Sequence, residues 1–296
     1  MHVTDDLVVH RQWIVGDLRM HVVEAGEGPL VVLLHGFPDF WFSWRRQVPA
    51  LVAAGYRVVA PDLRGYARTE APRRVDRYGP EHLVDDVAGL ITAAGERRAT
   101  LVGHDWGGIV SWLVAGRRPD LVERVAICNA PHPTAYRRAL ASSAQALRSW
   151  YAYLFMLPAV PERLLRARSG ALLRHVLRAG ARRPDSFSDA DLDRYVTELL
   201  GSGDLTGPIN YYRATGRQLL RTGGRFVAGD GGEQTVGQPV LVLWGEQDPA
   251  LAAAAAEPPR DLVPDVRVVR FPEAGHWVHL DADEAVNAEL LGWLAA

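Results

Sequence analysis

Short apolar runs that alternate with helical patterns constrain the fold of this chain more than any other feature. Such near-continuous runs are typical of strands that are buried on both faces of a parallel sheet. We predict strands at residues 29–34, 57–60, 99–102, 122–128, 239–243 and 266–271, and a hairpin at 7–15 and 18–23. Helices are predicted at about residues 43–54, 79–94, 107–117 and 283–294. The pattern therefore predicts an α/β domain with a mostly parallel central sheet and helices on both faces.

The alternation is interrupted once. After Pro131, and as far as about Gly237, the chain shows helical patterns and loops but no convincing buried strand. We therefore expect a core formed by residues 1–131 and 238–296, with residues 132–237 inserted as a helical cap. Arginine is dense in the cap segment, and its spacing by three or four residues indicates the solvated face of amphipathic helices rather than a site for an anionic partner.

Composition excludes several functional classes. The 296 residues include 33 basic and 35 acidic side chains, and every basic side chain is arginine. A chain without lysine cannot form a lysine Schiff base or a G-K-[ST] phosphate loop, and a net charge of −2 argues against a nucleic-acid-binding protein. Cys128 is the only cysteine, so a disulfide scaffold is excluded. Because no signal peptide or apolar run of roughly 18 residues is found, we expect a cytoplasmic protein without a membrane partner.

The sharpest chemical signal is the motif G-H-D-W-G-G at residues 103–108. It follows a predicted strand and opens a helical pattern, which is the setting of the nucleophile elbow G-x-S-x-G, with Asp105 in the serine position. The glycines allow the tight turn, and the positive end of the helix dipole favours an ionised carboxylate. We therefore interpret Asp105 as a nucleophile rather than as a helix cap.

An aspartate nucleophile restricts the substrate. A carboxylate with an ordinary pKa of about 3.9 is already charged at neutral pH. Its attack on an ester or amide would form a mixed anhydride, which is a poor intermediate, whereas its attack on a saturated carbon with a leaving group forms a stable ester. Asp105 therefore predicts an alkyl electrophile, either an epoxide or a carbon–halogen bond.

An elbow enzyme needs an acid and then a histidine later in the chain. Asp248 and His276 each follow a predicted strand, so both are expected at the sheet edge where Asp105 lies. His276 would activate water, and Asp248 would orient its ring. Glu246 and His279 compete for these roles, but the Asp-Pro and Gly-His turns favour Asp248 and His276. Metal binding by the two histidines is not expected, because no third ligand or H-E-x-x-H helix accompanies them.

Two backbone N–H groups complete the expected site. The motif H-G-F-P at residues 35–38 follows a predicted strand at the place where elbow enzymes supply one oxyanion donor. We assign the donors to the N–H groups of Phe37 and Trp106, which would stabilise the oxyanion formed when water attacks an Asp105 ester. The side chains of Trp41 and Phe155 are predicted to contact the substrate in an apolar pocket.

Four motifs together resemble the α/β-hydrolase-fold epoxide hydrolases, over nearly the whole chain. They are H-G-F-P at 35–38, D-L-R-G-Y at 62–66, G-H-D-W-G-G at 103–108 and Gly275-His276. The resemblance implies the α/β-hydrolase fold with its inserted cap. In this family two cap tyrosines protonate the epoxide oxygen, and the segments S-W-Y-A-Y at 149–153 and I-N-Y-Y-R at 209–213 resemble those that carry them. The resemblance therefore places them at Tyr151 and Tyr212.

The resemblance implies a two-step reaction that needs no metal or organic cofactor. Asp105 attacks an epoxide carbon while the two tyrosines donate to its oxygen, and water activated by His276 then hydrolyses the ester to a vicinal diol. The expected partners are a small apolar epoxide and water, and the chain is expected to be a monomer or a homodimer. One alternative is a haloalkane dehalogenase with the same triad, which would release halide. Another is a non-catalytic small-molecule receptor on the same fold.

Overall fold

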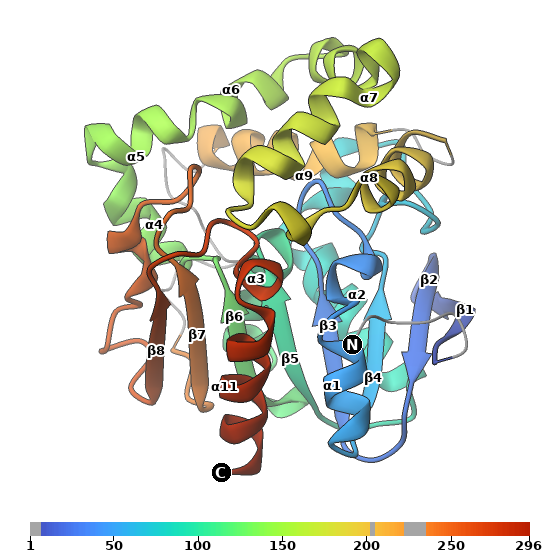
Figure 1. The fold of residues 1–296 in the computed structure, drawn as a ribbon, viewed down its shortest axis with the longest axis vertical. Coiled ribbons are helices and arrows are strands. Elements are labelled where there is room, and N and C mark those ends of the chain that lie inside the picture. The colour runs from blue at the N-terminus through green and yellow to red at the C-terminus, as the bar shows by residue number, and fades with distance from the viewer. Residues whose placement is uncertain (1–6, 202–204, 222–234) are drawn as a thin grey trace.

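A mixed eight-stranded sheet forms the centre of the computed structural model, which describes residues 7–201, 205–221 and 235–296 (Figure 1). Its strand order is β1-β2-β4-β3-β5-β6-β7-β8. The strands are β1 (Val9–Val15), β2 (Leu18–Ala25), β3 (Leu30–Leu34), β4 (Arg57–Pro61), β5 (Ala99–His104), β6 (Val122–Cys128), β7 (Val240–Gly245) and β8 (Val266–Phe271). The pairs β1–β2 and β2–β4 are antiparallel and the five other pairs are parallel, so the predicted hairpin and the mostly parallel sheet are both confirmed.

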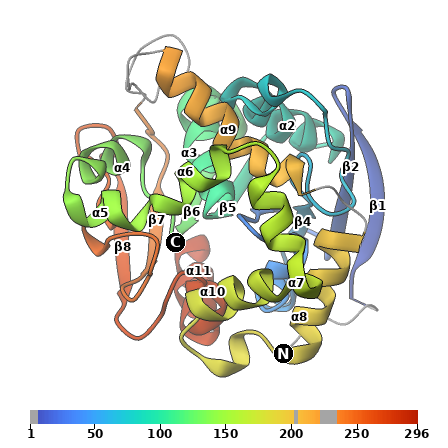
Figure 2. The same ribbon diagram turned by 90° about the horizontal axis from the view of Figure 1, so that it is seen from above.

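The middle strands are buried on both faces, as their unbroken apolar sequences require. Every residue of β3, β5 and β7 is buried. Helices α1 (Val48–Ala53) and α11 (Asp283–Ala295) cover one face of the sheet, and α2 (Pro80–Ala93) and α3 (Trp106–Arg117) cover the other (Figures 1 and 2). The predicted α/β-hydrolase architecture is thereby confirmed.

One predicted helix is shorter than expected. Residues 41–44 form a 3₁₀ turn, and α1 begins only at Val48. Pro49 occupies the first turn of α1, where its fixed φ and missing N–H are tolerated. The predicted helix at 43–54 is therefore split: its first residues belong to the 3₁₀ turn, and the α-helix covers only residues 48–53.

Helices also account for the described residues between β6 and β7, among which no strand is found. They are α4 (Pro133–Leu140), α5 (Ser143–Arg148), α6 (Trp150–Met156), α7 (Val160–Gly180), α8 (Asp189–Val196) and α9 (Thr206–Arg221), with short turns between them. These helices lie across the carboxyl edge of the parallel strands (Figures 1 and 2). Residues 202–204 and 222–234 of the expected cap lie outside the described part. Nowhere in that part is a helix both long and apolar enough to cross a membrane.

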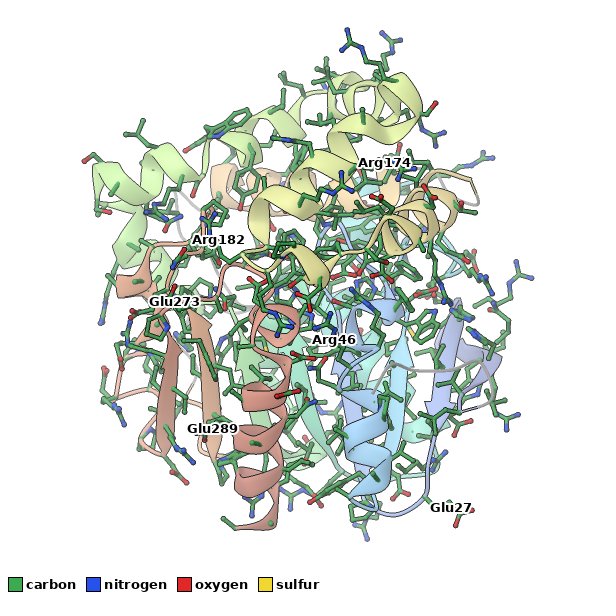
Figure 3. All side chains as sticks on the ribbon, in the orientation of Figure 1. Glu27, Arg46, Arg174, Arg182, Glu273 and Glu289 are labelled. Atoms are coloured by element: carbon green, nitrogen blue, oxygen red, sulfur yellow. The ribbon has the colours of Figure 1, made fainter. Side chains whose placement is uncertain are left out.

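Several cap arginines contact other parts of the protein instead of only facing solvent. Arg174 pairs with Asp193 at 2.7 Å within the cap. Arg182 lies where the cap meets the core (Figure 3), and its Nη2 donates to the carbonyl oxygen of Gln247 at 2.8 Å. Arg148 Nη1 likewise donates to the carbonyl oxygen of Asp248 at 2.6 Å. The prediction that these arginines form a solvated face is therefore incomplete, because Arg148 and Arg182 join the expected cap to the core.

Candidate active site

Asp105 lies at the turn between β5 and α3, in a backbone conformation with φ of 48°. The turn is tight, because a Cβ on Gly107 would lie 2.0 Å from the carbonyl oxygen of Leu34. A Cβ on Gly36 would lie 2.4 Å from Cβ of Asp105, so the H-G-F-P segment also approaches closely. The Asp105 side chain makes no capping hydrogen bond to α3. Its carboxylate is therefore not used as a helix cap.

His276 lies between two carboxylates. Its Nδ1 is 2.8 Å from Asp248 Oδ2, and its Nε2 is 3.8 Å from Asp105 Oδ2. The competing candidates lie elsewhere: Glu246 pairs with Arg270 at 3.2 Å, and His279 Nε2 is 2.8 Å from the hydroxyl of Ser43. The structure thus brings Asp105, His276 and Asp248 together and leaves Glu246 and His279 outside the group.

Charge and burial shift the pKa of all three side chains. Burial alone would lower the pKa of His276, but the adjacent Asp248, helped by Asp105, raises it to about 9. Burial opposes ionisation of Asp248, yet His276 and the hydrogen bonds around the carboxylate hold its pKa below the ordinary value. Burial raises the pKa of Asp105, and His276 limits that rise. The raised pKa of His276 therefore favours an imidazolium beside Asp248 and Asp105 in the free site.

The two oxygens of Asp105 lie in different surroundings. The N–H of Phe37 donates to Oδ1 at 2.7 Å, and the backbone N–H of Trp106 helps to lower the pKa of the carboxylate. Oδ2 instead faces the imidazole of His276. An ester formed through Oδ2 would leave Oδ1 beside the two N–H donors, where negative charge develops when water attacks.

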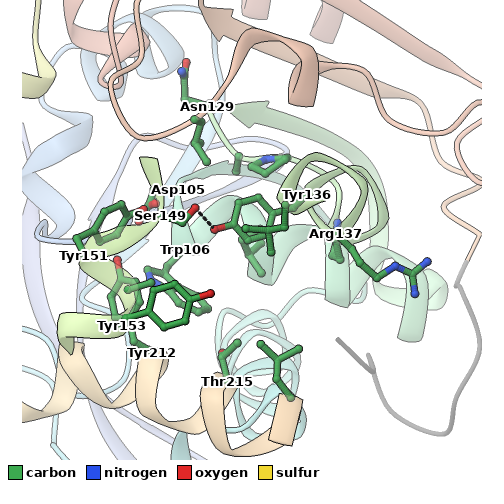
Figure 4. A pocket seen from close by; sticks show the side chains of 18 of the residues that line it. Asp105, Trp106, Asn129, Tyr136, Arg137, Ser149, Tyr151, Tyr153, Tyr212 and Thr215 are labelled. Carbon is green, nitrogen blue, oxygen red and sulfur yellow. Dashed lines mark hydrogen bonds between the residues drawn. The ribbon is translucent and has the colours of Figure 1, made fainter. Parts of the chain in front are cut away.

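Tyr151 on α6 and Tyr212 on α9 line the same pocket as Asp105 (Figure 4). Their ring centroids are 6.1 Å apart, and the Tyr212 ring packs edge to face on Trp106 at 5.1 Å. Burial raises the pKa of both phenols well above the ordinary value, and the charge of Asp105 adds to this effect. Both phenols therefore stay protonated and can donate a hydrogen bond to an oxygen in the pocket.

The pocket is mostly apolar and has a volume of about 190 Å³. Besides the residues above, its walls include Ile109, Leu140, Met156, Leu219 and Leu251. Low polarity around a few convergent polar groups is typical of a small-molecule site.

Two residues predicted to contact the substrate do not line this pocket. Trp41 packs at 5.3 Å from the ring of His10 and under the guanidinium of Arg194, because the loop after β3 carries it toward β1 and β2. Phe155 packs against Phe37 at 5.0 Å and against Tyr212 at 4.9 Å, so it supports the pocket wall from behind. Both side chains therefore lie outside the walls of this pocket, and their contact with a substrate stays a prediction.

Sequence reasoning missed Asn129. Its Nδ2 donates to Asp248 Oδ2 at 2.8 Å, and its Oδ1 accepts the N–H of Gly245 at 2.8 Å. Asn129 directly follows β6, so the rule that polar residues after parallel strands meet at one edge could have identified it. Its amide supplies Oδ2 of Asp248 with a second hydrogen bond, beside that of His276, without adding a charge.

A buried group beneath the base has the residue types of a metal site. Asp39, His104 and His279 lie close enough together to hold an ion. However, Asp39 accepts hydrogen bonds from several protein donors, among them the hydroxyl of Ser43. His104 Nε2 donates to the carbonyl oxygen of His276 at 3.0 Å. Asp39 and the Nε2 atoms of His104 and His279 thus have protein partners, whereas the Nδ1 atoms of both histidines have none among the described residues. We assign the group to packing beneath His276.

Comparisons with known proteins agree with this geometry. A family model described as alpha/beta hydrolase fold matches residues 29–283. An AB hydrolase superfamily protein of Bacillus subtilis, YfhM, is 37% identical over 94% of each chain. Epoxide hydrolase 2 of Caenorhabditis elegans is 36% identical over 92% of this chain and 76% of its own length. The crystal structure of a mutant epoxide hydrolase from Bacillus megaterium is 28% identical and has a TM-score of 0.90, covering 97% of this chain and 100% of that one.

Proposed function

The chain belongs to the alpha/beta hydrolase fold family, and on that premise we propose that it is an epoxide hydrolase converting a small apolar epoxide to a vicinal diol. The observation that carries the proposal is the presence of two protonated phenols, the partly buried Tyr151 and the buried Tyr212, in the pocket of the Asp105 carboxylate. Opening an epoxide needs a nucleophile and also a proton donor, because an alkoxide is a poor leaving group unless it is protonated. Residues 132–237 act in this proposal as the cap that brings the phenols to the nucleophile.

In the first step, Oδ2 of Asp105 attacks an epoxide carbon and the carbon–oxygen bond breaks. The departing oxygen takes a proton from a cap phenol, and the proton of the His276 imidazolium then restores that phenol. The products are an alkyl ester of Asp105 and a neutral imidazole. No cofactor takes part in this scheme.

In the second step, loss of the Asp105 charge makes His276 a base. The Asp105 carboxylate is one of the two that raise the pKa of His276, so esterification lowers that pKa. His276, oriented by Asp248, takes a proton from water, whose oxygen attacks the ester carbonyl carbon. The N–H groups of Phe37 and Trp106 stabilise the oxyanion. The intermediate then releases the diol, and the original protonation states return.

The proposal is tested by diol formation from racemic styrene oxide, with Asp105→Ala as the inactive control. We expect diol from the wild type and none from the variant, which should still fold because Asp105 supports no capping hydrogen bond. His276→Gln should form the ester but not hydrolyse it, so that its mass increases by that of the substrate. Diol formation by Asp105→Ala would contradict the proposal.

The second candidate is a haloalkane dehalogenase with the same triad. A halide leaves without protonation, so that reaction does not require the two phenols. Release of halide from a primary haloalkane, without diol from any epoxide, would favour this alternative.

A further inference from the structure

The loop that carries Asp248 orients the carboxylate through its own turn. Oδ1 of Asp248 accepts the N–H of Ala250 at 2.7 Å and that of Leu251 at 3.0 Å. This arrangement leaves Oδ2 for His276 Nδ1, at 2.8 Å. The direction of Oδ2 therefore depends on the backbone conformation of residues 248–251.

Two side chains of α5 hold the backbone of this loop. The Nε2 of Gln145 donates to the carbonyl oxygen of Ala250 at 2.9 Å, and its Oε1 accepts the N–H of Ala252 at 2.8 Å. Arg148 Nη1 donates to the carbonyl oxygen of Asp248 at 2.6 Å. Gln145 is completely buried, so water cannot replace its partners.

The same helix is bonded to the pocket wall. The Nε2 of Gln145 also donates to the hydroxyl of Ser149 at 3.0 Å. That hydroxyl lies 3.0 Å from the hydroxyl of Tyr136, and both residues line the pocket (Figure 4). Ser149 directly precedes α6, which carries Tyr151. Continuous hydrogen bonds thus join the pocket wall, the start of α6 and the loop of Asp248.

We propose that Gln145 and Arg148 are positioning residues, which hold Asp248 on His276 by fixing the backbone of residues 248–252. Because α5 leads directly into α6, the same contacts keep the Asp248 carboxylate at a fixed position relative to Tyr151. This inference rests on the proposed function of the triad. Displacement of Asp248 disorients the His276 ring and slows ester hydrolysis, whereas attack by Asp105 needs no base and keeps its rate.

The test compares Arg148→Met, Arg148→Lys and Arg174→Met by rapid quenching with styrene oxide and mass analysis of the covalent adduct. Arg148 is preferred to the buried Gln145 because its side chain is exposed, so the variants should fold. Arg174, the matched control, lies high on the cap and pairs with Asp193 instead (Figure 3). In Arg148→Met we expect hydrolysis to slow by about tenfold and ester formation to change by less than about twofold. Lysine should restore hydrolysis, and Arg174→Met should match the wild type.

A second readout needs no turnover. The proton shared by His276 Nδ1 and Asp248 should give a low-field proton NMR resonance in the substrate-free wild type. We expect it to broaden or shift upfield in Arg148→Met and to stay unchanged in Arg174→Met. An unchanged resonance in Arg148→Met, or equal slowing of both chemical steps, would overturn the inference. A wild type that opens no epoxide would refute the proposed function alone, because the resonance still tests the positioning role.

Discussion

At the scale of single residues, the base is controlled by which of its neighbours carry charge. Asp248 and Asp105 both raise the pKa of His276, whereas Asn129 reaches Asp248 with a neutral amide. A third carboxylate at position 129 would raise the pKa of His276 further and keep the imidazole protonated after the ester forms. The neutral amide therefore suits the proposed role of His276, in which the imidazole loses its proton during each turnover.

The phenols give the first prediction at this scale. Tyr151→Phe and Tyr212→Phe keep the aromatic packing but remove the proton donors. We expect ester formation from an epoxide to slow by about 10²-fold in each variant, because the departing alkoxide loses a donor. The measurement is the rate constant of adduct formation in a single turnover.

Tyr211→Phe is the matched control for these variants. Tyr211 neighbours Tyr212 on α9, but its hydroxyl donates to the carbonyl oxygen of Arg64 at 3.1 Å. This substitution should cost about 1 kcal/mol of folding stability while ester formation keeps the wild-type rate. Wild-type rates in both Tyr151→Phe and Tyr212→Phe would contradict the assignment of the proton donors.

At the scale of elements, the parallel strands gather the site at one edge of the sheet. Five neighbouring strands, β3, β5, β6, β7 and β8, all end at this edge. The residues that follow them are, in the same order, Phe37, Asp105, Asn129, Asp248 and His276. The strand order, more than the distance along the chain, therefore determines which side chains meet.

The nucleophile elbow depends on the close packing of α3 against β3, which Gly107→Ala tests. An added Cβ would lie 2.0 Å from the carbonyl oxygen of Leu34, which belongs to the backbone and cannot rotate away. We expect the free energy of unfolding to fall by about 3 kcal/mol or more, measured by urea denaturation.

Gly292→Ala in α11 is the control for Gly107→Ala. Gly292 lies inside α11, and among the described residues no atom beyond its chain neighbours and the helix's own nearby backbone lies within 4 Å of a Cβ added there. Alanine should therefore stabilise the protein by about 0.5–1 kcal/mol. Equal changes in the free energy of unfolding at the two glycines would show that the packing of α3 against β3 does not determine the stability of the elbow.

At the scale of the whole molecule, the charges of the site make folding stability depend on pH. The pKa of His276 is about 9 in the folded protein, against about 6.5 in an unfolded chain. The folded state binds this proton more tightly, so the stabilisation is complete below pH ~6.5 and is lost as the pH rises through ~9. The lowered pKa of Asp248 acts in the opposite direction: its stabilisation is present above pH ~4 and is lost as the pH falls further.

Urea unfolding across this range tests the prediction. The wild type should lose stability between pH ~6.5 and ~9, and His276→Gln should not show this loss. His175→Gln, which removes an exposed histidine of α7, should keep the wild-type profile. Identical profiles for His276→Gln and the wild type would contradict the raised pKa of His276.

The local sequence was sufficient to predict the sheet and the kind of chemistry. Strands β3 and β7 lie close to the predicted residues, because an unbroken apolar run is stable only when both of its faces are buried. The chemistry expected of Asp105 follows from a carboxylate in place of serine, which is a property of one residue. Trp41 does not line the pocket, and its aromatic character could not reveal which side of the loop faces it.

The tertiary structure alone decided which side chains support the triad. Arg148 and Asp248 are 100 residues apart in the chain, and Asn129 and Asp248 are 119 residues apart. Their contacts depend on how α5 lies against the loop after β7 and on β6 and β7 being neighbours in the sheet. An arginine in a polar helix looks solvated in the sequence, because hydrogen bonds to a distant carbonyl leave no local pattern. The sequence by itself therefore determined the fold and the reactive groups, and packing decided how they are held.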